Sequence, residues 1–113
     1  LYQDCCDLYH LSLSAPNAEK LMRSRYSAYV LGLEEYLLNT WHPNTRPQAL
    51  NLKQDRTQWL GLEVKHFEPN DEQAIVEFIA RYKINGKAGK MQETSRFKRI
   101  ATRWFYVDGD FTE

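Results

Sequence analysis

The stretch from Gln73 to Gly86, QAIVEFIARYKING, decides the fold class of this chain. It is rich in Ile, Val, Phe and Tyr, and its side chains alternate with the period of two that indicates a β-strand over Gln73–Ile84. Asn85-Gly86 supplies a strong turn signal, because both residues tolerate the left-handed backbone of a tight hairpin. The alternation predicts one strand face with Val76, Phe78, Ala80 and Tyr82, and another with Glu77, Ile79 and Arg81.

Three further strands are expected around this one. Before it, Trp59–Phe67 alternates in the same way, and residues 69–71 are typical of a turn. After it, Met91–Arg99 and Arg103–Asp108 are expected to pair as a hairpin closed around residues 100–102. The second half of the chain therefore predicts four antiparallel strands.

The first half of the chain shows helical spacing instead. Asn17 is expected to cap the start of a helix over Ala18–Leu31, which Gly32 ends. A second helix is expected over Leu33–Trp41 and a third over residues 46–57, with a proline in its first turn. The apolar stripe of the first helix consists of Ala18, Leu21, Met22, Ala28 and Tyr29, with Arg25 in its middle.

Helices followed by strands indicate an α+β fold, with the helices packed on one face of a curved antiparallel sheet of about four strands. The chain has 113 residues, which suits one domain of the usual ~100–200 residues. Hydrophobic residues make up 42 % and aromatic residues 13 %, so a packed core is expected rather than disorder. The 15 Lys and Arg balance the 15 Asp and Glu, which argues against a nucleic-acid or membrane partner.

The two cysteines, Cys5 and Cys6, are neighbours, so they predict no disulfide framework. Reduced thiols without a signal peptide predict a cytoplasmic protein. His10 adds at most a third metal ligand, whereas a structural zinc site needs four, so no cofactor is expected in this chain. The first residue, Leu1, and the polar end at Glu113 predict that native sequence continues on both sides.

Short blocks along nearly the whole chain carry a resemblance to a known family. They are Leu21–Val30, Tyr36–Leu38, Thr40–Pro43, Trp59–Leu62, Phe78–Tyr82, Glu93–Phe97 and Trp104–Gly109. In this order they resemble the YchJ family of small bacterial proteins. The resemblance implies the YchJ middle domain, which has the cone-shaped, cystatin-like fold of the nuclear-transport-factor-2-like proteins. It implies no particular reaction.

In the YchJ family this domain is typically flanked by SEC-C motifs, zinc-binding segments with a Cys-x-Cys pair followed by Cys-Cys or Cys-His. Tyr2–Cys6 looks like the second half of such a motif. The resemblance therefore implies that residues 1–17 are the remnant of a SEC-C motif with a linker, and that residues 18–113 are the middle domain. Cys5 and Cys6 are then half of a zinc site, which implies zinc in the full-length protein.

A cone of this kind encloses a pocket between the sheet and the helices. General acid–base chemistry there would use His42, Glu93 or Asp108. Arg25 and Arg81 would clamp a carboxylate or phosphate through paired guanidinium donors. The expected lining is Arg25, Tyr29, Trp41, His42, Glu77, Arg81, Glu93, Ser95, Phe97, Trp104, Tyr106 and Asp108.

The same residues have structural interpretations. Arg25 is expected to be a buried arginine held by Glu77, Glu93 or Asp108, because an unpaired buried charge is costly. His42 stands at a helix end, where its ring favours the negative end of the helix dipole. The sequence contains neither a Gly-x-Ser-x-Gly elbow nor a glycine-rich phosphate loop, which weakens the case for hydrolysis or nucleotide binding.

Three functions follow from these alternatives. The favoured one is a non-catalytic module that binds a protein partner or a small anionic ligand. The second is an isomerase or dehydratase type of enzyme that uses His42 with Glu93 or Asp108. The third is a dimerisation scaffold, in which two copies pair through an open sheet face carrying Trp59, Phe67 or Phe105.

Overall fold

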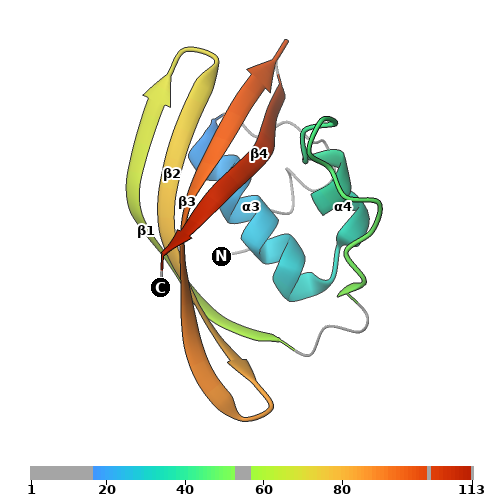
Figure 1. The fold of residues 1–113 in the computed structure, drawn as a ribbon, viewed down its shortest axis with the longest axis vertical. Helices are drawn as coiled ribbons and strands as arrows, with labels where there is room; N and C mark the ends of the chain where they lie inside the picture. The colour runs from blue at the N-terminus through green and yellow to red at the C-terminus, as the bar shows by residue number, and fades with distance from the viewer. Residues whose placement is uncertain (1–16, 53–56, 102, 113) are drawn as a thin grey trace.

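The computed structural model describes residues 17–52, 57–101 and 103–112. Two helices and four strands follow in the predicted order: α3 (Ala18–Leu31), α4 (Glu34–Asn39), β1 (Gln58–Asn70), β2 (Gln73–Ile84), β3 (Lys87–Ile100) and β4 (Arg103–Thr112). The strands form one antiparallel sheet in the order β1-β2-β3-β4. The sheet is curved, and both helices lie on its concave side (Figure 1). The predicted α+β architecture is confirmed.

Helix α3 begins and ends where the sequence predicts. The Asn17 side chain accepts a hydrogen bond from the N–H of Lys20 at 2.8 Å, which satisfies one free amide of the first turn. Gly32 adopts φ 74°, a left-handed conformation that ends the helix. The buried side chains of α3 are Ala18, Leu21, Met22, Ser24, Arg25 and Ala28, so Arg25 is buried with the apolar stripe.

Helix α4 is shorter than the predicted helix over Leu33–Trp41. The chain leaves the helix at Thr40 because the next residues pair with the edge of β4. Trp41 forms a parallel bridge with Tyr106, and the N–H of His42 donates to the Tyr106 carbonyl at 2.7 Å. This pairing covers the edge of β4 at Tyr106 and fixes the Trp41 side chain next to the concave face.

The prediction of a third helix over residues 46–57 is wrong for those of its residues that the structure describes. No α-helix forms at residues 46–52, and all but one of the later residues lie outside the described part of the chain. The N–H groups of Leu50 and Leu52 donate instead to the Glu34 carboxylate, at 3.3 and 3.0 Å. A side chain of α4 therefore takes the amide protons that a helix would have used.

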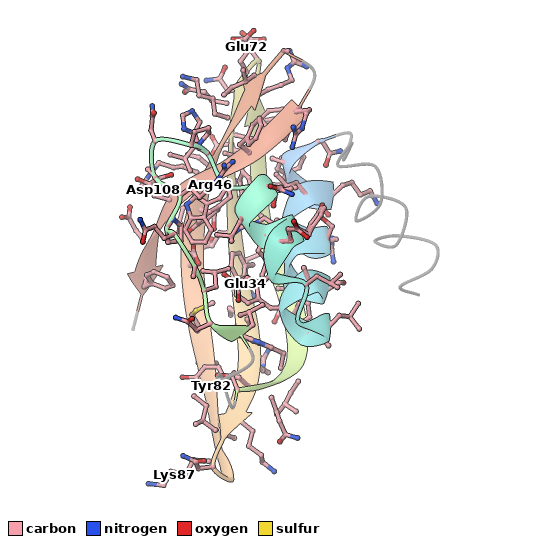
Figure 2. All side chains as sticks on the ribbon, turned by 90° about the vertical axis from the view of Figure 1, so that its right-hand side faces the viewer. Glu34, Arg46, Glu72, Tyr82, Lys87 and Asp108 are labelled. Carbon is pink, nitrogen blue, oxygen red and sulfur yellow. The ribbon has the colours of Figure 1, made fainter. Side chains whose placement is uncertain are left out.

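The four predicted strands are present, and the sheet is longer than predicted. β3 begins at Lys87, directly after the Asn85-Gly86 turn, and β4 continues beyond Asp108. β1 continues to Asn70 and β2 begins at Gln73, so the turn consists of Asp71 and Glu72 and overlaps the predicted turn at residues 69–71 only at Asp71. Figure 2 shows the two turns, marked by Glu72 and Lys87, at opposite ends of the molecule.

The concave face of the sheet carries the core. Two bulges in β1 keep Trp59 and Phe67 on this face, where both pack against the buried cluster around Phe78. Phe105 is also buried, with its ring edge-on to His42 at 6.3 Å between centroids. The three aromatic residues expected on an open, dimer-forming face are therefore not on one.

Candidate functional site

A pocket of about 250 Å³ lies between α3 and the concave face of the sheet. Its walls are mostly aromatic or aliphatic, with a few polar side chains from α3, β3 and β4. Apolar concave sites with few converging polar groups are the usual form of small-molecule sites. The lining consists of Met22, Arg25, Tyr26, Tyr29, Trp41, Trp59, Phe78, Ala80, Met91, Glu93, Ser95, Phe97, Tyr106 and Phe111.

Arg25 is the cation of this pocket and is only 5 % exposed. Its Nη1 donates to the Leu37 carbonyl at 2.7 Å and to Thr40 Oγ1 at 2.6 Å. Its guanidinium carbon lies 5.0 Å from the centroid of the Trp41 ring and 4.7 Å from that of Tyr106. Burial lowers the pKa of Arg25. Among the described residues, no ion pair joins it to the carboxylates expected to hold it: Glu77, Glu93 and Asp108.

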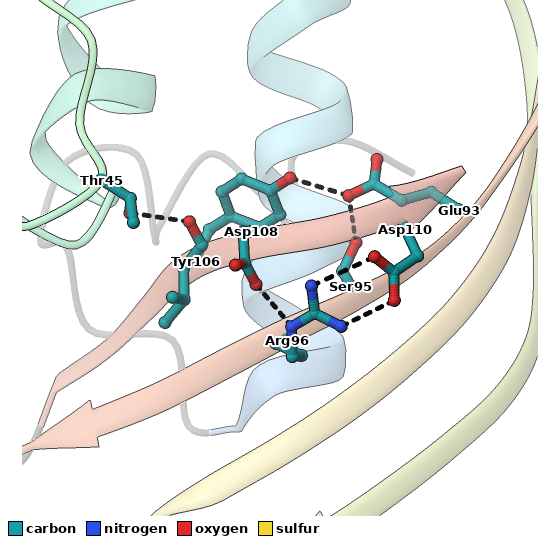
Figure 3. A network of polar contacts seen from close by, with 8 residues as sticks. Thr45, Glu93, Ser95, Arg96, Tyr106, Asp108 and Asp110 are labelled. Carbon is teal, nitrogen blue, oxygen red and sulfur yellow. Dashed lines mark hydrogen bonds and ion pairs between the residues drawn. The ribbon is translucent and has the colours of Figure 1, made fainter.

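Glu93 is the anion of the pocket and is also 5 % exposed. Its Oε2 accepts hydrogen bonds from Ser95 Oγ and from the Tyr106 hydroxyl, each at 2.8 Å (Figure 3). Burial, followed by the negative charge of Glu93, raises the pKa of Tyr106, so this hydroxyl keeps its proton and donates. Glu93 Oε1 has no hydrogen-bond partner within the described part of the chain.

The position of Asp108 differs from the prediction because β4 changes phase at a bulge. Phe97 pairs with Tyr106, whereas the preceding residue, Arg96, pairs with Asp108, which leaves Val107 as the extra residue. Asp108 is thereby turned to the convex face, where its Oδ1 accepts from Arg96 Nε at 2.6 Å. It does not line the pocket.

Beyond the bulge, Gly109 and Phe111 face the pocket side. A Cβ added to Gly109 would lie 2.7 Å from Cδ of Glu93, so the missing side chain makes room for the carboxylate. Phe111 pairs with Glu93 across the strands and lines the pocket while 63 % exposed, which places it at the mouth. The signal for this shift is in the sequence, since the aromatic residues change from an even position at Tyr106 to an odd one at Phe111.

Glu77 and Arg81 lie on the convex face and do not line the pocket. Glu77 accepts a hydrogen bond from Gln92 Nε2 at 2.8 Å, and Arg81 lies 3.6 Å from the Glu63 carboxylate. The reason is the regular alternation of β2, which gives the concave face to the other set of side chains. The predicted clamp of Arg25 with Arg81 is therefore not formed.

His42 and Trp104 also lie outside the pocket lining. His42 is buried beside Phe105, and its Nδ1 accepts from the N–H of Asn44 at 3.1 Å. Trp104 belongs to the buried core. Of the predicted lining, the structure brings together Arg25, Tyr29, Trp41, Glu93, Ser95, Phe97 and Tyr106.

Several wall residues were not among those predicted, and all of them are apolar or aromatic. Met22 lies on the same helical stripe as Arg25, and Phe78 and Ala80 lie on the strand face opposite to that of Arg81. The periodicity of the sequence therefore indicates that these three side chains face the pocket. The additional lining residues are Met22, Tyr26, Trp59, Phe78, Ala80, Met91 and Phe111.

The described residues contain no cluster of three or more His, Cys, Asp or Glu side chains that would hold a metal ion. Cys5 and Cys6, the predicted half of a zinc site, lie outside the described part, as does the rest of residues 1–16. No described helix combines the length and apolar character needed to cross a membrane.

Comparison with known proteins identifies the family. The sequence profile of the YchJ middle NTF2-like domain matches residues 17–109. The chain belongs to this family. The match includes Arg25, Glu93, Tyr106 and Gly109, and it ends before Phe111. The YchJ resemblance and the NTF2-like fold inferred from the sequence are thus confirmed.

Curated relatives and solved structures agree with the YchJ assignment. A UPF0225 protein from Chromobacterium violaceum is 55 % identical over 112 residues, which cover 93 % of this chain and 83 % of that protein. A UPF0225 protein from Bordetella pertussis is 50 % identical over 113 residues, which cover 96 % and 85 %.

Two solved structures share the fold. The solution structure of a SEC-C motif containing protein from Rhodopseudomonas palustris matches with a TM-score of 0.87 at 31 % identity, covering 99 % of this chain and 92 % of that chain. The crystal structure of a SEC-C motif containing protein from Psychrobacter arcticus matches with a TM-score of 0.81 at 36 % identity, covering 96 % and 71 %.

Proposed function

We propose that this domain is a non-catalytic binding module whose pocket holds a small, largely apolar molecule. The observation that carries the proposal is the pocket of about 250 Å³ with mostly aromatic walls beneath α3. This volume exceeds the ~150 Å³ cavity known to bind benzene, so it suits one aromatic ring with a short side chain, or two fused rings. Burial of such a ring against Trp59 and the neighbouring tyrosines would supply most of the binding free energy.

The arrangement of titratable groups supports a binding role over catalysis. His42 and Asp108, two of the three groups considered for acid–base chemistry, are directed away from the pocket. Glu93 remains, but the groups that donate hydrogen bonds to it are the hydroxyls of Ser95 and Tyr106. Burial raises the pKa of Tyr106, so its hydroxyl holds its proton more tightly. Within the described part of the chain, Glu93 therefore has no second carboxylate or histidine beside it in the pocket to share acid–base chemistry.

The dimerisation alternative is less well supported than the binding module. Its expected contact residues, Trp59, Phe67 and Phe105, are engaged within the domain. Zinc binding by Cys5 and Cys6 in a longer chain stays a separate prediction, which the zinc content of purified full-length protein tests.

The proposal is tested by titrating indole, an uncharged two-ring probe, into the ¹⁵N-labelled domain. We expect saturable shifts of the side-chain Nε1–H signals of Trp41 and Trp59 at submillimolar to millimolar concentrations of the probe. Ala80→Leu fills the pocket from the floor of β2 and is expected to abolish these shifts. Ala88→Leu makes the same change at an exposed position of β3 and is expected to keep them. No saturable shift, or equal shifts in both variants, contradicts the proposal.

A further inference from the structure

We propose that the pocket selects an uncharged aromatic molecule with an amide-like head, in which an N–H group and a carbonyl oxygen stand side by side. This inference rests on the proposed binding function and names the chemical class of the ligand. It follows from three features of the pocket: its two opposite charges, the hydrogen-bonding positions left on them, and the aromatic walls around the remaining volume.

The first feature is that Arg25 and Glu93 line one pocket without forming an ion pair. Tyr106 lies between them, since its ring faces the Arg25 guanidinium at 4.7 Å and its hydroxyl donates to Glu93 at 2.8 Å. The other lining residues in the described part of the chain include no Asp, Glu, Lys, Arg or His. The charges of these described lining residues therefore balance, with a positive and a negative group kept apart by one aromatic ring.

The second feature is the hydrogen-bonding capacity left on these two groups. Both hydrogen bonds to Glu93 fall on Oε2, which leaves Oε1 as an acceptor with no partner in the described residues. Nη1 is the donor in both hydrogen bonds of Arg25, and Nε and Nη2 donate to none of the described residues. Each residue is 5 % exposed, so these positions are largely shielded from water and are stabilised by gaining a hydrogen-bond partner.

These positions decide what kind of head group fits. A carboxylate would accept from Arg25 but bring a second negative charge towards Glu93. An ammonium group would donate to Glu93 but bring a second positive charge towards Arg25. Either ion would also leave a net charge in a desolvated site. An amide-like head avoids both costs, because its carbonyl oxygen accepts from Arg25 while its N–H donates to Glu93 Oε1.

The third feature is the aromatic wall around the remaining volume. The Trp59 ring meets Tyr26 at a centroid distance of 6.0 Å and an interplanar angle of 74°, and it meets Tyr29 at 6.0 Å. Rings in these orientations accept a further aromatic ring edge-on or offset. An aromatic body is therefore expected to lie towards Trp59, with the head towards Arg25 and Glu93.

The inference is tested with four probes of similar size: phenylacetamide, phenylacetate, phenethylamine and ethylbenzene. Their affinities for the wild-type domain are measured by NMR titration at neutral pH and low salt. We expect phenylacetamide to bind at least tenfold more tightly than each of the two ions and than ethylbenzene, which lacks a head group.

Glu93→Gln supplies a second, independent readout. Removing the negative charge leaves Arg25 as the sole charge among the described lining residues, so phenylacetate is expected to gain at least tenfold in affinity relative to phenylacetamide. Glu77→Gln makes the same change on the convex face and is expected to leave the ranking of the four probes unchanged.

The possible outcomes separate this inference from the proposed function. If an ion binds as tightly as phenylacetamide, or if all four probes bind equally, the amide-like head is wrong while the binding pocket stands. An unchanged ranking in Glu93→Gln also overturns it. If none of the four probes binds, and indole fails as well, both the head group and the binding function are wrong.

Discussion

Two polar networks lie on opposite faces of the same pair of strands, β3 and β4. On the concave face, Glu93 accepts from Ser95 and Tyr106. On the convex face, Arg96 donates to Asp108 at 2.6 Å and to Asp110 at 2.8 Å. Figure 3 shows both networks, which are separated by the alternation of side chains along β3 and by the bulge at Val107 in β4. Their hydrogen bonds are of similar length, so geometry alone does not distinguish them.

Burial does distinguish them. The Glu93 carboxylate is 5 % exposed, and the pKa of its donor Tyr106 is raised by burial. The convex side chains are 44 % to 75 % exposed, and hydrogen bonds from Arg96 lower the pKa of Asp110. Water and salt screen the convex pairs, whereas the concave groups depend on one another for hydrogen bonds. The comparison predicts large effects of substitution on the concave side and small ones on the convex side.

The largest effect is expected from Arg25→Ala. The substitution removes a buried side chain that donates to two acceptors and contacts the Trp41 and Tyr106 rings, so the free energy of unfolding should fall by about 3 kcal/mol. Urea denaturation measures this loss. Arg23→Ala on the same helix is the control, because Arg23 makes a partly exposed ion pair with Glu19 and should cost about 0.5 kcal/mol. A loss below about 1 kcal/mol for Arg25→Ala contradicts a structural role on the concave side.

The next effect is expected from Gly109→Ala. Its Cβ would clash with the Glu93 carboxylate, which must then leave Ser95 and Tyr106, and we expect a loss of about 2 kcal/mol. Gly61→Ala is the matched control, because a Cβ there meets nothing within 4 Å, and a change within about 0.5 kcal/mol is expected. Equal stability of the two variants in urea would show that Glu93 moves aside freely.

Arg25 also shows how much of the structure can be predicted from the sequence. The burial of Arg25 is predictable, since it lies in the middle of an apolar helical stripe. Its partners are not, because Thr40 and Trp41 reach it only after the chain leaves α4 and pairs with β4. A pairing between distant segments has no local sequence pattern, and the sequence predicts carboxylate partners for Arg25 instead.

The candidate site also contains residues whose positions follow from the sequence and residues whose positions do not. Glu93, Ser95 and Tyr106 are predictable because two regular strands place their alternating side chains on one face. Asp108 is not, because one extra residue in β4 reverses the alternation beyond Tyr106. The elements of the fold follow from periodicity and turn residues, whereas a single bulge decides which carboxylate reaches the pocket.

A smaller effect is expected from Tyr106→Phe, which removes a hydrogen bond to a buried carboxylate and should cost about 1.5 kcal/mol at neutral pH. The pH dependence gives a sharper test. The folded-state pKa of Tyr106 lies above the ordinary value of 10.0, so its contribution is complete below pH 10 and is lost as pH rises further.

Wild-type stability is therefore expected to fall more steeply above pH 10 than that of Tyr106→Phe. Tyr82→Phe is the control on the same face of the sheet, since the Tyr82 hydroxyl makes no hydrogen bond with the described residues. This variant should keep the steep alkaline decline of the wild type. Identical alkaline slopes for wild type and Tyr106→Phe, measured by urea denaturation between pH 9 and 11, contradict a protonated Tyr106 donor.

The smallest effect is expected from Arg96→Ala on the convex face. It removes more ionic contacts than any of the other substitutions, because Arg96 binds both Asp108 and Asp110. Exposed ion pairs nevertheless gain little over the hydration that they replace, and salt screens what remains. We expect urea denaturation to show a smaller change than for Tyr106→Phe at low salt, and none in molar sodium chloride. A loss that equals that of Tyr106→Phe and persists in high salt contradicts the distinction by burial, since the two faces would then be stabilised equally by the number of contacts alone.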